Sequence, residues 1–158
     1  MNRYASQTSV APERSRMEIE RTCARYGATG FVYGYDDGRG AMVAFQYADP
    51  PRRVRFILPL PVPAEAERTE TGRRRHGQGA RERAHALETR RRWRALALAI
   101  KAKLETVASG IATFDDEFLA YLVLPGGATV GERLARELPT ALDAGRLPPL
   151  LAAPPKEA

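Results

Sequence analysis

The sequence predicts an α+β protein in which a small antiparallel sheet of three to four strands is covered by two helices. Between residues 31 and 58, short runs alternate apolar and polar residues and are separated by turns, which is the pattern of half-buried strands. Between residues 80 and 109, apolar residues recur every three or four positions, which predicts a helix packed along one side. The length of 158 residues and the apolar fraction of 44% suit one domain with its own core.

The first helix is expected over residues 16–26, because Ser15 and Glu18 have the spacing of a capping box. Gly27 should end this helix. Its buried side chains should be spaced about one turn apart: Ile19, Cys23 and Tyr26. The segment before it, residues 1–14, is polar and is expected to be flexible. The single cysteine excludes an internal disulfide and a cysteine zinc cluster, and a buried structural thiol is expected.

Three strands should follow, over residues 31–35, 41–47 and 53–58. Turns rich in glycine or proline separate them, and prolines at positions 59, 61 and 63 stop the third strand. The alternation places one apolar set on the buried side of the sheet: Val43, Phe45, Tyr47, Val54, Phe56 and Leu58. Arg53 and Arg55 should lie on the opposite side.

The segment 64–79 is charged, contains three glycines and lacks apolar periodicity, so a mobile basic loop is expected. The long helix after it, over residues 80–109, should end at Gly110. Its two faces differ in character. An inner apolar stripe contains Trp93, Leu96, Ile100, Leu104 and Val107, and a basic stripe contains Arg83, Arg90, Arg94 and Lys101.

The C-terminal part is expected to be short and helical. Thr113 and Asp116 should start a short helix that runs to about Tyr121, and residues 122–130 suit a small hairpin. A second capping box at Thr129 predicts a helix toward Ala144, interrupted by Pro139 and ended by Gly145. Residues 15–151 would then form the single domain, followed by a disordered tail over residues 152–158.

Basic charge is concentrated in one segment. Between Arg68 and Lys103 there are twelve Arg and Lys residues and three Glu residues, whereas the whole chain has 25 basic and 19 acidic residues. The remainder is therefore mildly acidic. A localised basic block of this kind is typical of proteins that bind polyanions, and nucleic acid is the partner it predicts. The alternative is a solvated arginine-rich helix without a ligand.

Candidate nucleic-acid-binding residues come from the strands, the basic loop and the basic stripe: Arg53, Arg55, Arg73, Arg74, Arg75, Arg83, Arg90, Arg94, Lys101, Tyr33 and Tyr35. The tyrosines are included because single-strand binders stack bases on aromatic side chains of an open sheet face. A core role beneath the helices is the other interpretation of the strand aromatics, and Trp93 is expected in the core.

Catalysis, cofactors and metals find little support in the sequence. The two histidines, His76 and His85, lie in the basic region without a paired nucleophile. The acids at 115–117 fall in a first helical turn, where carboxylates favour the helix dipole. No strand, glycine loop and helix follow one another as a phosphate-binding motif requires. A non-enzymatic protein without a cofactor or metal is expected.

Membrane insertion and secretion are not expected either. The longest apolar run, residues 95–100, is too short to span a bilayer, and the N-terminus carries no secretory signal. A cytoplasmic protein is therefore expected. Because a sheet of three or four strands is small, a homodimer or higher oligomer is expected too.

Four segments resemble a family of small, largely uncharacterised proteins encoded by bacteriophages and prophages: 90–107, 111–125, 25–31 and 54–61. The resemblance covers most of residues 15–151 and implies a phage context without assigned catalytic residues. The leading expectation is sequence-tolerant binding of single-stranded DNA in phage replication or recombination. The alternative is a phage protein-interaction factor, an inhibitor or adaptor that docks on an acidic host protein.

Overall fold

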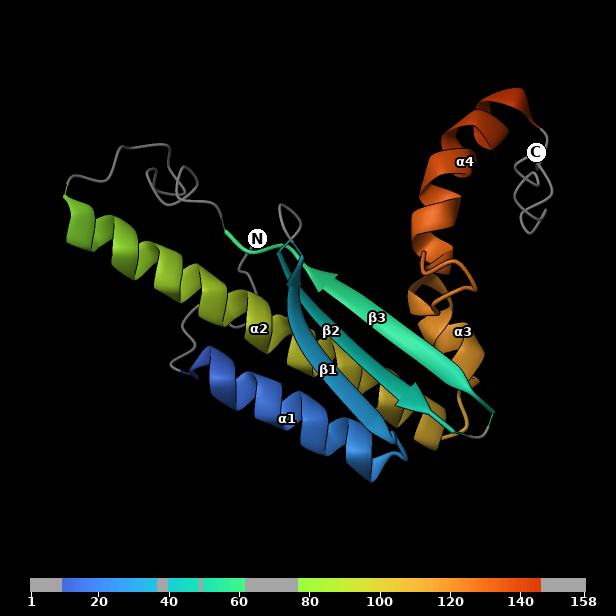
Figure 1. Cartoon of the computed structure of the whole chain (residues 1–158), viewed down its shortest axis with the longest axis horizontal. Coiled ribbons are helices and arrows are strands. Elements are labelled where there is room, and N and C mark those ends of the chain that lie inside the picture. Colours follow the sequence, from blue (N-terminus) through green and yellow to red (C-terminus); the bar gives the residue numbers. More distant parts are fainter. Residues whose placement is uncertain (1–9, 37–39, 49, 62–76, 146–158) are drawn as a thin grey trace.

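The computed structural model describes residues 10–36, 40–48, 50–61 and 77–145, and it confirms the α+β class (Figure 1). Its sheet is a meander of three antiparallel strands in the order β1 (Gly30–Asp36), β2 (Gly40–Tyr47) and β3 (Arg52–Leu58). Phe45 lies opposite Phe31 on β1 and opposite Val54 on β3. The register therefore brings the expected apolar residues to one face of the sheet.

The core forms on that face around Phe45, whose side chain is 2% exposed. Four aromatic rings surround it, with centroids between 5.7 and 6.2 Å away: Phe31, Tyr47, Phe56 and Phe118. Val43, Val54 and Phe56 are buried beside it, as the alternation predicts. The aromatic strand residues thus supply core packing.

Helix α1 (Pro12–Arg25) begins earlier than the capping box predicts. Pro12 occupies the first turn, where its fixed φ and missing N–H are favourable, and Ala11 is the N-cap. Ser15 is instead buried inside the helix, and its hydroxyl has no hydrogen-bond partner among the described residues. The predicted start was wrong, and residues 12–14 are helical rather than flexible. Gly27 ends the helix with a φ of 95°, as expected.

Helix α2 (Gln78–Ala108) has 31 residues and begins just after Gly77. Residues 78 and 79, expected in the basic loop, therefore belong to the helix. The rest of that loop up to residue 76 lies outside the described residues. The inner stripe is buried as predicted, through Trp93, Leu96, Ile100 and Leu104. Side-chain contacts between Glu18 and Arg94 and between Arg25 and Glu105 show that α1 and α2 run parallel (Figure 1).

The C-terminal part follows α2 and contains the short helix α3 (Phe114–Phe118) and the 3-10 helix η2 (Leu119–Tyr121). The capping box of Thr113 and Asp116 is present. The expected hairpin is reduced to a single bridge between Val123 and Thr129, while Leu122 bridges to Val54 on β3. The segment after η2 therefore joins the edge of the sheet.

Helix α4 (Val130–Ala144) opens with the second predicted capping box, in which Thr129 and Glu132 bond reciprocally. Pro139 lies inside the helix and does not interrupt it. Gly145, with a φ of 61°, follows its end. Figure 1 shows α4 extending away from the sheet and the other helices. Across the described ranges, no helix combines the length and the apolar character needed to cross a membrane.

Two adjacent residues of α2 test the division between core and surface. Ile100 is fully buried and Lys101 is exposed. Ile100→Ala should lower the free energy of unfolding by about 2–5 kcal/mol, because it leaves a cavity in a packed core. The neighbouring Lys101→Ala should change it by about 0.5 kcal/mol or less. Chemical denaturation of both variants measures these values, and equal losses would contradict the observed orientation of α2.

Candidate nucleic-acid interface

The solvent-facing side where α1 and α2 meet carries two rows of charged residues. The α1 row has helical spacings of four, three and four residues, and the α2 row has spacings of seven, four, seven and four. We call these nine residues the basic face: Arg14, Glu18, Arg21 and Arg25 on α1, with Arg83, Arg90, Arg94, Lys101 and Glu105 on α2. Seven of the nine are cationic.

Cross-helix ion pairs hold the two rows together. Arg94 binds the carboxylate of Glu18, and the Arg25 guanidinium lies 3.2 Å from a Glu105 oxygen. Arg94, predicted as a binding residue, is therefore partly neutralised by an acid 76 residues away in the sequence. Its charge contributes to the surface potential, but its guanidinium is also part of the packing between α1 and α2.

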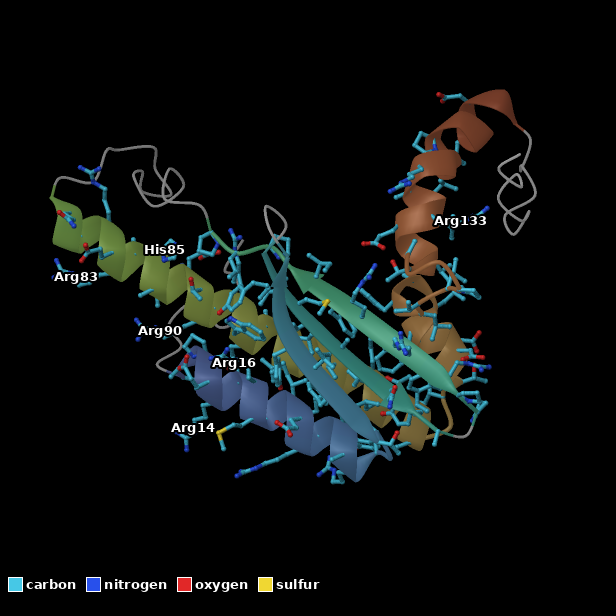
Figure 2. The ribbon with its side chains drawn as sticks, in the orientation of Figure 1. Arg14, Arg16, Arg83, His85, Arg90 and Arg133 are labelled. Atoms are coloured by element: carbon cyan, nitrogen blue, oxygen red, sulfur yellow. The ribbon has the colours of Figure 1, made fainter. Side chains whose placement is uncertain are left out.

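Five cations of the basic face form no hydrogen bond or ion pair within the part of the chain that the structure describes: Arg14, Arg21, Arg83, Arg90 and Lys101. Arg90 is half-buried and the other four are exposed. Figure 2 shows Arg83 and Arg90 projecting from the side of α2 on which α1 lies. Four of these positions therefore present unneutralised charge directly to solvent.

Two strand arginines predicted for the site lie on the other face of the sheet. Val54 points into the core, so the alternation turns Arg53 and Arg55 away from α1 and α2. Arg53 is exposed, whereas Arg55 is 2.5 Å from the Glu132 carboxylate at the start of α4. The structure thus does not bring the strand arginines together with the basic stripe of α2.

The two predicted tyrosines differ in their surroundings. Tyr33 donates its hydroxyl hydrogen bond to the backbone carbonyl of Arg16, and its ring meets Trp93 edge-on at 6.3 Å. Burial raises the pKa of the Tyr33 hydroxyl. This side chain belongs to the core. Tyr35 is 72% exposed, so it is the member of the pair that is accessible to a base.

Tyr35 lies toward the N-terminal half of α2. Strand β1 starts just after Arg25, which contacts Glu105 near the end of α2, and its Tyr33 contacts Trp93. The strand therefore runs opposite to α2. Because Tyr35 follows Tyr33 on the same face, it continues toward α2 residues that precede Trp93. Arg83 and Arg90 lie in that part of the helix.

The remaining predicted arginines, Arg73, Arg74 and Arg75, lie outside the described residues. Sequence reasoning missed Arg14 and Arg21, which have no partner among the described residues. Arg14 was assigned to a flexible segment, and α1 alone is nearly balanced in charge. The spacing of Arg14, Arg21 and Arg25 places them on one helical face and could have revealed this row.

Metal ligation and thiol chemistry have no site in the described ranges. There, no group of three or more His, Cys, Asp or Glu side chains could hold a metal ion. Cys23 is fully buried, and burial raises the pKa of its thiol to about 12. A thiol with so high a pKa stays protonated at neutral pH and is a poor nucleophile. His85 has a ring nitrogen 3.0 Å from the carbonyl oxygen of Pro61.

No family model, curated protein or solved structure matches this chain. The function of the chain is therefore inferred from its residues and their arrangement.

The ion pair between α1 and α2 can be tested by a double-mutant cycle. Glu18→Ala, Arg94→Ala and the double variant should give a coupling energy of about 0.5–1 kcal/mol in the free energy of unfolding. Arg25 and Glu105 provide a matched comparison. Their side chains are 62% and 50% exposed, against 26% for Arg94 and 35% for Glu18, so their coupling should be smaller.

Both couplings should decrease as sodium chloride is added, because salt screens exposed charges. The cycle is measured by denaturant unfolding at low and high salt. A zero coupling for Glu18 and Arg94 would show that the contact does not help to hold α1 against α2.

Proposed function

We propose that this chain is a non-enzymatic nucleic-acid-binding protein that holds single-stranded DNA along its basic face in a sequence-tolerant manner. The observation that carries the proposal is the set of five cations without partners among the described residues, gathered from two parallel helices. Because α1 and α2 are adjacent, their charges act on the same ligand. The sequence alone placed these charges in one segment, whereas the fold adds a second row from α1.

The dimensions of the basic face suit an extended polyanion. Arg83 and Lys101 are eighteen residues apart on one helical face, which corresponds to roughly 27 Å along the α2 axis. Neutralising several phosphates over such a length releases counterions and gives affinity. Contacts of this type position the backbone without reading base edges, so sequence tolerance follows.

A preference for single strands is supported by the exposed ring of Tyr35. Its place near the N-terminal half of α2 puts an aromatic surface beside Arg83 and Arg90. Bases of an unpaired strand can stack on such a ring, whereas those of a duplex are already stacked. The segments that resemble phage and prophage proteins suggest replication or recombination as the process served.

A phage protein-interaction factor is the second candidate, and helix α4 favours it. Its apolar stripe packs on η2 at the helix start and continues as Leu138 and Leu142, which are 43% and 70% exposed. An amphipathic helix that projects with uncovered leucines is suited to dock in an apolar groove of another protein. This alternative predicts a host protein as the partner, which the chain would inhibit or link to another protein as an adaptor.

Replacing three cations of the basic face tests the leading proposal. The triple variant Arg83→Ala, Arg90→Ala and Lys101→Ala should bind a single-stranded oligonucleotide weakly at low salt. With about five phosphate contacts, the wild-type plot of log K against log salt should have a slope near about −3.5, and the triple variant should lose about 2 from its magnitude. Fluorescence anisotropy at several salt concentrations gives both slopes.

The matched control is Arg53→Ala, an exposed arginine on the other side of the sheet. It removes one charge from the chain and should leave both the affinity and the slope nearly unchanged. An equal effect of Arg53→Ala would point to diffuse net charge instead of the basic face. Wild-type protein that fails to bind at low salt would exclude the proposal and favour docking through α4.

A further inference from the structure

A cavity of about 460 Å³ lies where the end of α1, the turn before β3 and the start of α3 meet. This volume is in the range of sites that bind small planar molecules. The residues important for its chemistry are three aromatics, Tyr26, Tyr47 and Phe114, and one ion pair, Arg52 with Asp115. They come from segments far apart in the sequence, so the cavity is a product of the fold.

The aromatic walls are fixed by packing against the core. The Phe114 ring stacks on Phe118 at 4.6 Å and meets the Tyr47 ring edge-on at 4.7 Å. The hydroxyl of Tyr47 is buried and has no hydrogen-bond partner among the described residues. This hydroxyl is not accessible from the cavity, so Tyr47 contributes the apolar part of its ring to the wall.

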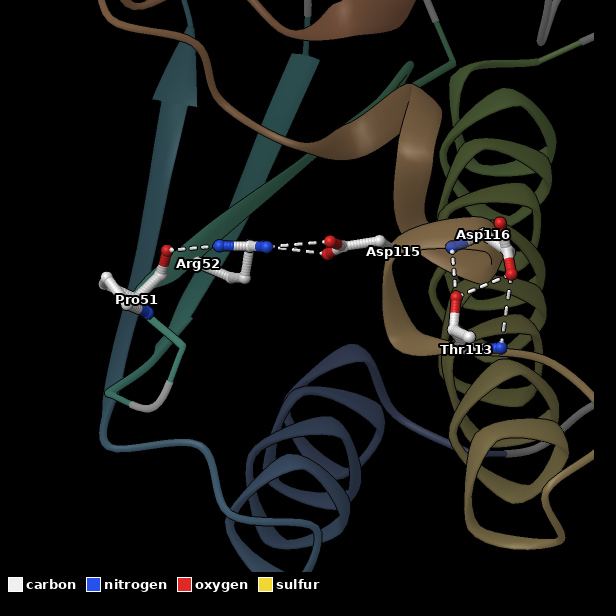
Figure 3. A network of polar contacts seen from close by, with 5 residues as sticks. All are labelled: Pro51, Arg52, Thr113, Asp115 and Asp116. Carbon is white, nitrogen blue, oxygen red and sulfur yellow. Dashed lines mark hydrogen bonds and ion pairs between the residues drawn. The ribbon is translucent and has the colours of Figure 1, made fainter.

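One side of the cavity presents a polar pair. Arg52 donates from Nε and from one terminal nitrogen to the two carboxylate oxygens of Asp115, at 2.7 and 2.8 Å (Figure 3). The hydrogen bond from Arg52 holds the pKa of Asp115 below its usual value. Each carboxylate oxygen has a further lone pair, so Asp115 can still accept a hydrogen bond from a ligand N–H.

Most of the charges around the cavity belong to ion pairs, whereas the carboxylate of Asp116 is bound only by a neutral partner. Asp116 is engaged by Thr113 in the capping box, as Figure 3 shows, and Glu117 binds Lys103 at 3.1 Å. Together with the pair of Arg52 and Asp115, this leaves an aromatic, hydrogen-bonding environment in which Asp116 keeps its negative charge. Such a site suits an uncharged planar group and does not suit a phosphate.

The cavity adjoins the basic face. Arg25 is the last cation of the α1 row, and its guanidinium lies 4.9 Å from the centre of the Tyr26 ring. Tyr26 is also a wall of the cavity. A strand whose phosphates follow the α1 row from Arg14 to Arg25 would therefore arrive at the cavity entrance.

We propose that this cavity takes one unstacked nucleobase of the bound single strand, held between Tyr26 and Phe114 with an N–H of the base edge on Asp115. The inference rests on the proposed function, because the basic face delivers the strand. It adds a reason for single-strand preference that the charges alone do not provide, since a paired base cannot enter a cavity without leaving its stack.

The nucleobase site and the basic face are tested separately with two oligomers of equal length and phosphate number. One is oligothymidine and the other is an abasic oligomer that lacks every base. Wild-type protein should bind oligothymidine roughly 5- to 100-fold more tightly, from the stacking of a base on an aromatic side chain. In a Tyr35→Leu background, which removes stacking on the exposed Tyr35 ring, Tyr26→Leu and Phe114→Leu should lose most of the remaining preference while keeping the background protein's affinity for the abasic oligomer. The triple variant of the basic face should lose affinity for both oligomers.

Asp115→Asn keeps the aromatic rings of the cavity. It should reduce the preference for oligothymidine less than Tyr26→Leu or Phe114→Leu does. Thermal melts establish that each variant is folded. If Phe114→Leu unfolds, Tyr26→Leu decides, because Tyr26 lies at the partly exposed end of α1. Equal wild-type affinity for the two oligomers, or a preference retained in Tyr26→Leu, would overturn the nucleobase site and leave the basic face intact. If the triple variant keeps its affinity for both oligomers, the basic face is not the binding surface.

Discussion

The structure depends on the burial of Phe45 in the middle strand. Because side chains alternate along a strand, the burial of Phe45 fixes which face of the sheet each residue of β2 occupies. The register of the strands fixes the faces of the β1 and β3 residues in the same way. All the large aromatic residues of the sheet thereby lie on one side, and of these Tyr35, at the end of β1, is exposed. Helices α1, α2 and α3 cover that side, and Arg53 and Arg55 face away from it.

This constraint separates the cations of the chain into two groups. The strand arginines on the far face are few, and Arg55 is tied to Glu132. The helix pair carries twelve Arg and Lys residues against six Glu residues in α1 and α2 together. Since the apolar stripes of both helices point to the sheet, their charges collect on the outside. The basic face is thus a consequence of the same packing that builds the core.

Much of the fold was predictable because its determinants are local. The strands follow from period-two alternation, the inner stripe of α2 from helical spacing, and two capping boxes from a threonine and an acid three residues later. The capping box at Ser15 failed because Pro12, one turn earlier, provides an alternative helix start. Local signals can compete, and the sequence does not show which one prevails.

The candidate site was only partly predictable because its decisive contacts are long-range. The pairing of Arg94 with Glu18 spans 76 residues, and that of Arg52 with Asp115 spans 63. Neither has a signature in the sequence, so Arg94 looked free and Arg52 was overlooked. These contacts also determine which surface charges are neutralised. Cations without a partner among the described residues remain where α1 and α2 meet, while an ion pair lines the aromatic cavity at the end of the α1 row. We therefore propose a polyanion with uncharged planar substituents as the ligand that would match both regions.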